Sequence, residues 1–289
     1  MNSKATMLTG RLSTLINKGY RRVTASSRIL PSYLIIGASK CGTTSLYNYL
    51  IQHPAIFPAA TKEVHFFDYY YHRGLSWYKS HFPTRGEVDR CSAVNAQSCI
   101  TGESSPYYFA HPLSPQRAKE VLPDARLICM LRNPVDRALS SYYNQVRLGI
   151  EKLPSFEEAL NAEESRIAGQ EERLRRDPAY SGFEHKYFSY FRRGCYVDQL
   201  ENWLRCFDRD RIMVIQSEIF FSQPDQIFPG VLKHIGVQPW TPSGFRVFNA
   251  GGEYTGISPR VREELLERYR PYNERLFSLL GQRFEGWDR

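Results

Sequence analysis

The chain has 289 residues, of which 42% are hydrophobic and 14% are aromatic, and this composition excludes a largely disordered protein. Its 38 lysines and arginines exceed its 30 aspartates and glutamates, so the formal net charge of +8 favours anionic partners such as nucleotides, acidic glycans or an anionic membrane surface. The length allows one α/β domain with a sizeable core.

Residues 1–30 are predicted to be a basic leader, and residues 31–289 a single domain. No aspartate or glutamate occurs in residues 1–62. Because the leader has no apolar run long enough for a signal peptide or a transmembrane segment, we expect a cytoplasmic protein. A frayed leader, an organelle transit peptide and an amphipathic helix in weak peripheral contact with a membrane all stay open. Four apolar residues support the helix by their spacing: Leu8, Leu12, Leu15 and Ile16.

A strand, a loop and a helix are predicted within residues 33–52. Residues 33–36 are a short apolar run that is typical of a buried strand. Residues 43–52 carry apolar side chains at helical spacing, and we expect the helix to end before Pro54. This is the context that a phosphate-binding loop needs, because a helix N-terminus offers free N–H groups and the positive end of the helix dipole.

The loop GASKCG, residues 37–42, has the glycine spacing of a P-loop but carries its lysine elsewhere. A P-loop NTPase has a lysine directly after the second glycine, where this chain has Thr43. Lys40 lies two residues before Gly42. From that position its ammonium group could reach a bridging oxygen on which negative charge grows during group transfer.

Strands and helices alternate along the rest of the chain. Strands are predicted at residues 99–102, 126–132 and 211–218. Helices are predicted near residues 114–121, 134–148, 155–163, 195–207, 225–235 and 258–280. This alternation predicts an α/β fold with a P-loop-like, mostly parallel sheet flanked by helices on both faces. Residues 163–194, charged and then aromatic, are interpreted either as a lid over a cleft or as a solvated helical hairpin.

The strand at residues 126–132 runs into Arg132 rather than into an aspartate. A kinase needs a strand-end aspartate to complete its Mg²⁺ site, so an atypical P-loop nucleotide kinase is the weaker alternative. The six cysteines include no C-x-x-C pair, and no metal site is expected. Cys91 and Cys99 flank a short polar stretch and could pair in an oxidising compartment.

Four segments in this order resemble sulfotransferases that use 3′-phosphoadenosine 5′-phosphosulfate (PAPS). They are LIIGASKCGTTSLYNYLIQHP, TKEVHFFD with GLSWYKSHFP, TGESSPYYFAHP, and LRNPVDRALSSYYNQVRLG. They are similar to the heparan sulfate 3-O- and N-sulfotransferases and to their soluble bacterial relatives. The resemblance implies transfer of a sulfonate group from PAPS to an acceptor hydroxyl, or less favourably an amine, with release of 3′-phosphoadenosine 5′-phosphate (PAP) and no required metal.

The resemblance also implies the residues that contact the donor. These are Lys40, Cys41, Gly42, Thr43, Thr44 and Ser45 at the 5′-phosphosulfate, Arg132 and Ser140 at the 3′-phosphate, and Gly252 and Tyr254 in a loop that closes over the nucleotide. An arginine suits a phosphate clamp because it forms charge-assisted, often bidentate hydrogen bonds.

On the acceptor side, the resemblance makes Glu63 the general base that takes the proton from the attacking group. Lys40 would neutralise the leaving oxygen. His65 is a second candidate base, because cytosolic sulfotransferases use a histidine. His65 and Asp68 match residues that contact the acceptor. Lys62, which precedes Glu63, is a further candidate for acceptor binding, and it could instead be solvated.

One residue departs from the family pattern. Ser104, in GESSPYYF, stands where the 3-O-sulfotransferases have a lysine, so one contact to an acidic glycan is expected to be lost. The acceptor therefore stays open among a glycan, a glycolipid and a small-molecule alcohol. A non-catalytic PAP-binding protein is a further alternative. Nucleic acid is not an expected partner, because no recognised binding module is present.

Overall fold

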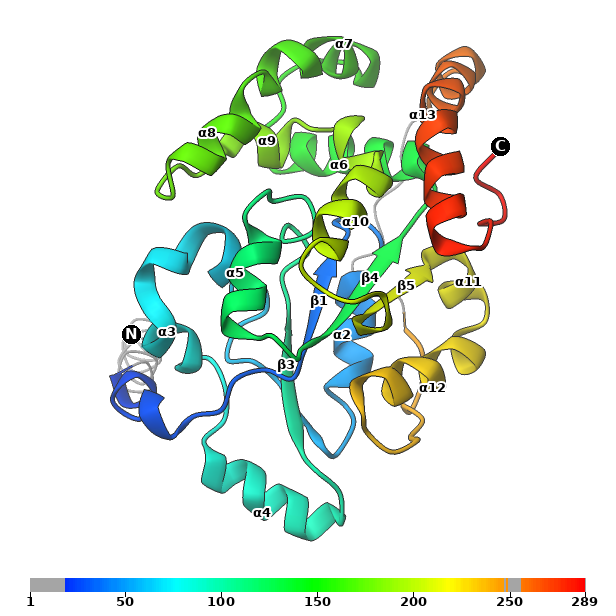
Figure 1. Ribbon diagram of the computed structural model, residues 1–289. Coiled ribbons are helices and arrows are strands. Elements are labelled where there is room, and N and C mark those ends of the chain that lie inside the picture. The colour runs from blue at the N-terminus through cyan, green and yellow to red at the C-terminus, as the bar shows by residue number, and fades with distance from the viewer. Residues whose placement is uncertain (1–18, 247, 249–255, 289) are drawn as a thin grey trace, which may run out of the picture.

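The computed structural model describes residues 19–246, 248 and 256–288. At its centre lies a five-stranded parallel sheet with the strand order β2-β3-β1-β4-β5 (Figure 1). The strands are β1 (Tyr33–Gly37), β2 (Ile56–Phe57), β3 (Ile100–Ser104), β4 (Arg126–Leu131) and β5 (Ile212–Gln216). The predicted α/β fold with a parallel sheet is confirmed.

The central strand β1 pairs with β3 on one side and with β4 on the other. Tyr33, for example, is opposite Gly102 in β3 and Arg126 in β4. The chain builds one half of the sheet before it crosses to the other. In open α/β sheets a ligand binds outside the carboxyl ends of the strands at such a switch point.

Helices and short helical turns connect the strands. The α-helices are α2 (Thr43–Leu50), α3 (Gly74–Lys79), α4 (Arg85–Asn95), α5 (Ser114–Val121), α6 (Pro134–Arg147), α7 (Phe156–Ile167), α8 (Gln170–Arg176), α9 (Phe183–Tyr187), α10 (Tyr196–Leu204), α11 (Ser217–Ser222), α12 (Pro224–Ile235) and α13 (Pro259–Leu280). The shorter turns are η1 (Ala25–Ser27), η2 (Phe66–Tyr70), η3 (Tyr71–Arg73), η4 (Arg192–Gly194) and η5 (Arg209–Arg211). In Figure 1, helices α6 to α9 lie above the carboxyl ends of the strands. None of the described helices is long and apolar enough to cross a membrane.

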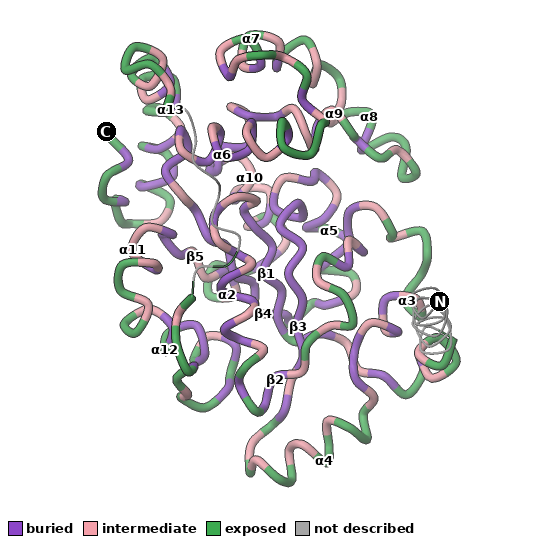
Figure 2. Tube along the Cα trace, turned by 180° about the vertical axis from the view of Figure 1, so that it is seen from behind, coloured by how far each residue is buried: buried purple, intermediate pink, exposed green. Residues whose placement is uncertain are grey.

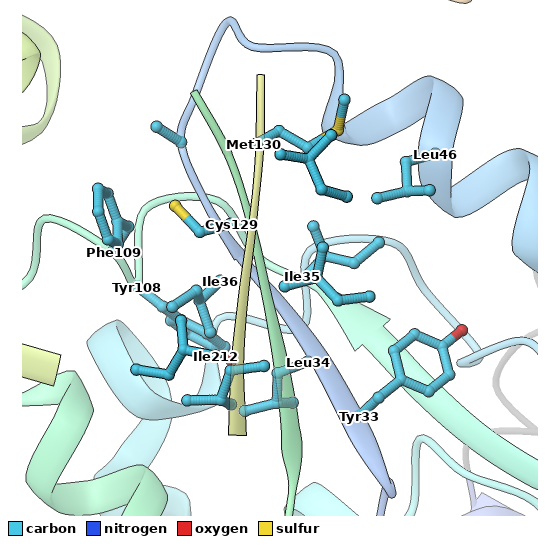
Figure 3. Close-up of a cluster of buried hydrophobic side chains, with 14 of the residues drawn as sticks. Tyr33, Leu34, Ile35, Ile36, Leu46, Tyr108, Phe109, Cys129, Met130 and Ile212 are labelled. Atoms are coloured by element: carbon cyan, nitrogen blue, oxygen red, sulfur yellow. The ribbon is translucent and has the colours of Figure 1, made fainter. Parts of the chain in front are cut away.

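The core lies on both faces of the sheet, and every residue of β1 is buried. Successive side chains of a strand point to opposite faces. Figure 3 shows Ile35 on the side of Leu46 from α2, and Ile36 and Cys129 on the other side near Phe109. Figure 2 shows that the strands of the sheet are buried, whereas α4 buries none of its residues.

Several parts of the chain differ from the prediction, among them the unpredicted short helix α3. The strand expected at 211–218 ends at Gln216, because Ser217 begins α11. Strand β2 was not predicted, since two residues carry no periodicity. Helix α4 was missed because it buries no side chain, although its capping box, Thr84 with Glu87, is a local start signal.

A disulfide joins Cys91 to Cys99. Cys91 lies in α4, and Cys99 directly precedes β3. The pairing that the sequence left open is therefore present in the structure.

Candidate active site

A cleft of about 750 Å³ lies at the carboxyl ends of β1, β3, β4 and β5. Most of the predicted donor contacts line it: Lys40, Cys41, Gly42, Thr43, Thr44, Arg132 and Ser140. Glu63, the candidate base, lines the same cleft. Segments separated by about a hundred residues in the chain are thus brought together at the switch point of the sheet.

The loop between β1 and α2 has the backbone that a phosphate-binding loop requires. Gly42 precedes α2 with φ 89°, in the left-handed region, and an added Cβ would lie 2.6 Å from the ring of Phe221. Only glycine fits there without strain. Because Gly42 has no side chain to cap α2, and the first turn contains no acidic residue, the N-terminus of α2 remains suited to an anion.

Several cations share the cleft with this loop. Burial lowers the pKa of Lys40, and the neighbouring positive charges of Arg147 and Arg132 lower it further. The ammonium group donates to Asn144 Oδ1 at 3.4 Å. Cations that repel one another in a partly buried site are stabilised when an anion binds between them.

Arg132 and Ser140 reach the cleft from the junction of β4 and α6. Arg132 follows the last residue of β4, and its carbonyl accepts a hydrogen bond from the Tyr196 hydroxyl at 2.9 Å. Asn133 caps α6 by accepting from the N–H groups of Val135 and Asp136. Ser140, buried on α6, therefore stands at a fixed position relative to Arg132.

Glu63 is held by two cations. Lys62 Nζ lies 2.9 Å from Glu63 Oε1, and His65 Nε2 lies 3.3 Å from Glu63 Oε2. The other ring nitrogen of His65 is 2.6 Å from Oδ2 of Asp68, whose side chain is fully buried. The imidazole thus lies between two carboxylates, which favours its doubly protonated form.

These contacts shift the pKa values in opposite directions. Burial alone would raise the pKa of Glu63, but the hydrogen bonds and charges of His65 and Lys62 lower it to about 2. Burial alone would lower the pKa of His65, but hydrogen bonds to Asp68 and Glu63 raise it to about 9. At neutral pH Glu63 is ionised and His65 is a cation. With 42% of its side chain exposed, Glu63 keeps lone pairs available to a further donor.

The backbone of Glu63 and His65 is strained, and hydrogen bonds to residues at the end of β3 hold it in place. Glu63 and His65 both have left-handed backbone, with φ 59° and 55°, a conformation that costs non-glycine residues about 1–3 kcal/mol each. The His65 N–H donates to Ser105 Oγ at 3.1 Å, and Ser105 donates to the buried carboxylate of Glu103 at 2.7 Å. Glu103 also accepts from the Tyr108 hydroxyl at 3.0 Å. Residues at the end of β3 thereby fix the turn.

Other predicted residues lie away from the lining of the cleft. Ser45 is buried and accepts a hydrogen bond from the Phe248 N–H at 3.0 Å. Lys62 and His65 contact Glu63, and Asp68 contacts His65, but none of the three lines the cleft itself. Gly252 and Tyr254 fall outside the described residues.

Some residues that line the cleft were not predicted. Asn144 lies one helical turn after Ser140, a spacing that could have identified it. Lys186, Tyr187 and Arg193 come from the aromatic and basic segment that was interpreted as a lid or a hairpin. The charged and aromatic composition of this segment made it recognisable in the sequence, but no local pattern indicated which of its side chains face the cleft. The described residues contain no cluster of three side chains that could hold a metal ion.

The chain is similar to known proteins in both sequence and structure. The family model described as "Sulfotransferase domain" matches residues 30–239. Heparan sulfate glucosamine 3-O-sulfotransferase 6 of Mus musculus is 31% identical over 90% of this chain and 75% of that protein. Membrane-associated sulfotransferase kil1 of Dictyostelium discoideum is 25% identical over 89% of this chain and 66% of that protein. The crystal structure of a sulfotransferase from Alicyclobacillus acidocaldarius superimposes with a TM-score of 0.64 at 31% identity, and the match covers 90% of this chain and all of the other.

Proposed function

Since the chain belongs to the sulfotransferase domain family and is an enzyme that transfers a sulfonate group, we propose that its donor is PAPS and that Glu63 is its general base. One observation carries this proposal: Lys40, Arg132 and Glu63 line the same cleft although they lie far apart in the chain. A cationic donor region beside an ionised carboxylate is the arrangement that sulfonate transfer to a hydroxyl needs.

On the donor side, the loop amides with Thr43 and Thr44 bind the 5′-phosphosulfate. Arg132 and Ser140 bind the 3′-phosphate. Lys40 stabilises the bridging oxygen, on which charge develops as the sulfur–oxygen bond breaks. The repulsion of Lys40 by Arg147 and Arg132 supports an anionic ligand at this place. The donor supplies the activated sulfonate, and none of these residues forms a covalent bond to it.

On the acceptor side, Glu63 takes the proton of the attacking hydroxyl while the oxygen forms its bond to sulfur in line with the leaving phosphate. A carboxylate with a pKa of about 2 is a weak base in the resting enzyme. The hydroxyl becomes acidic only as it bonds to sulfur, so the proton moves late. A positioned base contributes roughly 10²- to 10⁴-fold to the rate. His65 and Lys62 orient the carboxylate in this account, and Asp68 orients His65.

We take a carbohydrate hydroxyl as the first acceptor to test, because similar proteins are named as heparan sulfate glucosamine sulfotransferases. Ser104 supports an acceptor other than heparan sulfate itself. This residue does not line the cleft, and its hydroxyl is buried with no hydrogen-bond partner among the described residues. Glycolipids and small-molecule alcohols are the next classes to test, and amines come last.

The single domain over residues 31–289 and a peripheral membrane contact of the basic N-terminus stay proposals. Part of that N-terminus, residues 1–18, lies outside the described residues. A cytoplasmic location conflicts with the Cys91–Cys99 disulfide, since disulfides persist mainly in oxidising compartments. Trapping free thiols with an alkylating reagent in intact cells separates the two locations. If Cys91 and Cys99 do not react, their disulfide is intact and supports an oxidising compartment; if both are alkylated, the cytoplasm is supported.

Incubation with radiolabelled PAPS and a panel of glycans, glycolipids and simple alcohols tests the function. We expect label in at least one acceptor class, with no loss on addition of a metal chelator. Glu63→Gln, which keeps the size of the side chain, is the matched control and should transfer roughly 10²-fold less. Transfer that needs a divalent metal, or that is equal in the control, would contradict the proposed chemistry.

A further inference from the structure

Arg193 contacts two walls of the cleft at once. One guanidinium nitrogen, Nη2, donates to Ser39 Oγ at 2.6 Å, and Nη1 donates to the carbonyl of Lys186 at 2.8 Å. Ser39 belongs to the loop between β1 and α2, next to Lys40. Lys186 belongs to α9 and lines the cleft together with Tyr187. One side chain therefore joins the donor loop to the helix that supplies a separate wall.

The guanidinium of Arg193 is buried, and no described acidic side chain forms an ion pair with it. Burial lowers its pKa to about 10, with a contribution from the positive charge of Arg137, so it is still a cation at neutral pH. Three groups stabilise its positive charge. The Ser39 hydroxyl and the Lys186 carbonyl accept hydrogen bonds from it, and the face of the Tyr107 ring lies with its centre 5.4 Å away. A buried cation that lacks an acid partner gains most from an anion nearby.

The contacts continue from α9 to the residues that hold Glu63. Lys186 Nζ lies 4.4 Å from the ring centre of Tyr69. The Tyr69 ring stacks on Tyr107 at 5.7 Å with an angle of 28° between the planes. The Tyr69 N–H donates to Oδ1 of Asp68 at 2.6 Å. Arg193, Tyr107, Tyr69 and Lys186 thus form one packed layer between the donor loop and the acceptor side.

We propose that Arg193 is a positioning residue that couples the donor loop to α9, so that donor binding fixes Lys186 and Tyr187 in the acceptor part of the cleft. An anion in the loop attracts the buried guanidinium and orders Ser39, and both effects favour the arrangement in which Arg193 also holds the Lys186 carbonyl. By linkage, a fixed α9 in turn favours the bound donor. The inference rests on the proposed donor, because it needs an anion at the loop.

Hydrogen exchange of the α9 backbone, with and without PAP, tests the coupling without any acceptor. The Lys186 N–H bonds to the Gly182 carbonyl and the Phe188 N–H to the Glu184 carbonyl, both at 2.9 Å, so these amides report on the order of α9. Saturating PAP should slow their exchange about fivefold or more in the wild type. In Ser39→Ala, measured at PAP concentrations that saturate that variant, the slowing should fall to less than about twofold.

Arg193→Lys keeps the charge but cannot hold both walls with one planar group, and it should also lose the slowing. Arg192→Lys is the matched control: Arg192 pairs with Asp198 at 2.8 Å and does not line the cleft, so the slowing should persist. If Arg193→Lys does not fold, Ser39→Ala alone decides.

Three results would overturn the coupling. The first is wild-type protein that binds PAP in calorimetry but shows no slowing at α9. The second is a slowing factor that is unchanged in Ser39→Ala and Arg193→Lys, even if exchange is faster overall, because a merely structural role changes both states equally. The third is the absence of PAP binding altogether, which would reject the proposed donor and this inference with it.

Discussion

Replacing His65 with glutamine is expected to destabilise the protein by an amount that depends on pH. The imidazole lies between Asp68 at 2.6 Å and Glu63 at 3.3 Å, and its side chain is 15% exposed. Its pKa rises from an ordinary 6.5 to about 9 despite burial, which alone would lower it. At 1.36 kcal/mol per pH unit this rise corresponds to about 3 kcal/mol of stability from the charged form.

The sign follows from the direction of each shift. Because the pKa of His65 is raised by folding, its contribution is complete below pH 6.5 and is lost as the pH rises through about 9. The pKa of Glu63 is lowered by folding from 4.5 to about 2, so its contribution is present above pH 4.5 and is lost as the pH falls towards about 2. The cluster is therefore most stabilising between these two windows, from about pH 4.5 to 6.5.

Urea unfolding of the wild type and of His65→Gln from about pH 5.5 to 9.5 measures this dependence. The penalty of the substitution should be largest near the acidic end and should shrink by about 3 kcal/mol towards the alkaline end. His234→Gln is the control, because burial lowers the pKa of His234 and its ring is neutral throughout the upper half of the range. A His65→Gln penalty that is constant over the range would mean that folding does not raise the pKa of His65, and the reasoning would be refuted.

Three further predictions concern catalysis and stability. Glu63→Gln should reduce turnover roughly 10²-fold or more while PAP affinity changes little; near-normal turnover in Glu63→Gln, together with an inactive His65→Ala, would assign the base to His65. Lys40→Ala should lower turnover much more than it weakens PAP binding, because the charge on the leaving oxygen develops only in the transition state. A raised KM for the donor with intact turnover would instead make Lys40 a ground-state contact. Reduction of the Cys91–Cys99 disulfide should cost about 2.5 kcal/mol in urea unfolding, from the entropy of its short loop, whereas an unchanged midpoint would show that the bridge does not constrain the unfolded chain.

The sequence predicted well which residues of the proposed donor side line the cleft, because its signals are local. Gly42 and the helix after it follow from a strand, a loop and a helix within twenty residues. Arg132 and Ser140 follow from the end of one strand and the helix that it enters. The parallel sheet then brings these two local units together, since the carboxyl ends of neighbouring parallel strands meet at one edge.

The acceptor side could be predicted only in part. Glu63 and His65 were identified as candidates, but the left-handed turn that joins them depends on Ser105 and Glu103, which lie some forty residues away. Lys186 reaches the cleft because α9 folds over the sheet, and this placement depends on tertiary packing rather than on any pattern in its own segment. Contacts of this kind have no signal within the spacing of one helix or strand.

The affinity of PAP compared with that of 5′-AMP tests the central claim most directly. The two nucleotides differ only in the 3′-phosphate, the group assigned to Arg132 and Ser140. Each charge-assisted hydrogen bond to a phosphate contributes roughly 1.5–3 kcal/mol, so calorimetry in the presence of a metal chelator should show PAP binding at least about tenfold more tightly. Equal affinities would contradict the 3′-phosphate clamp and with it the assignment of PAPS as the donor.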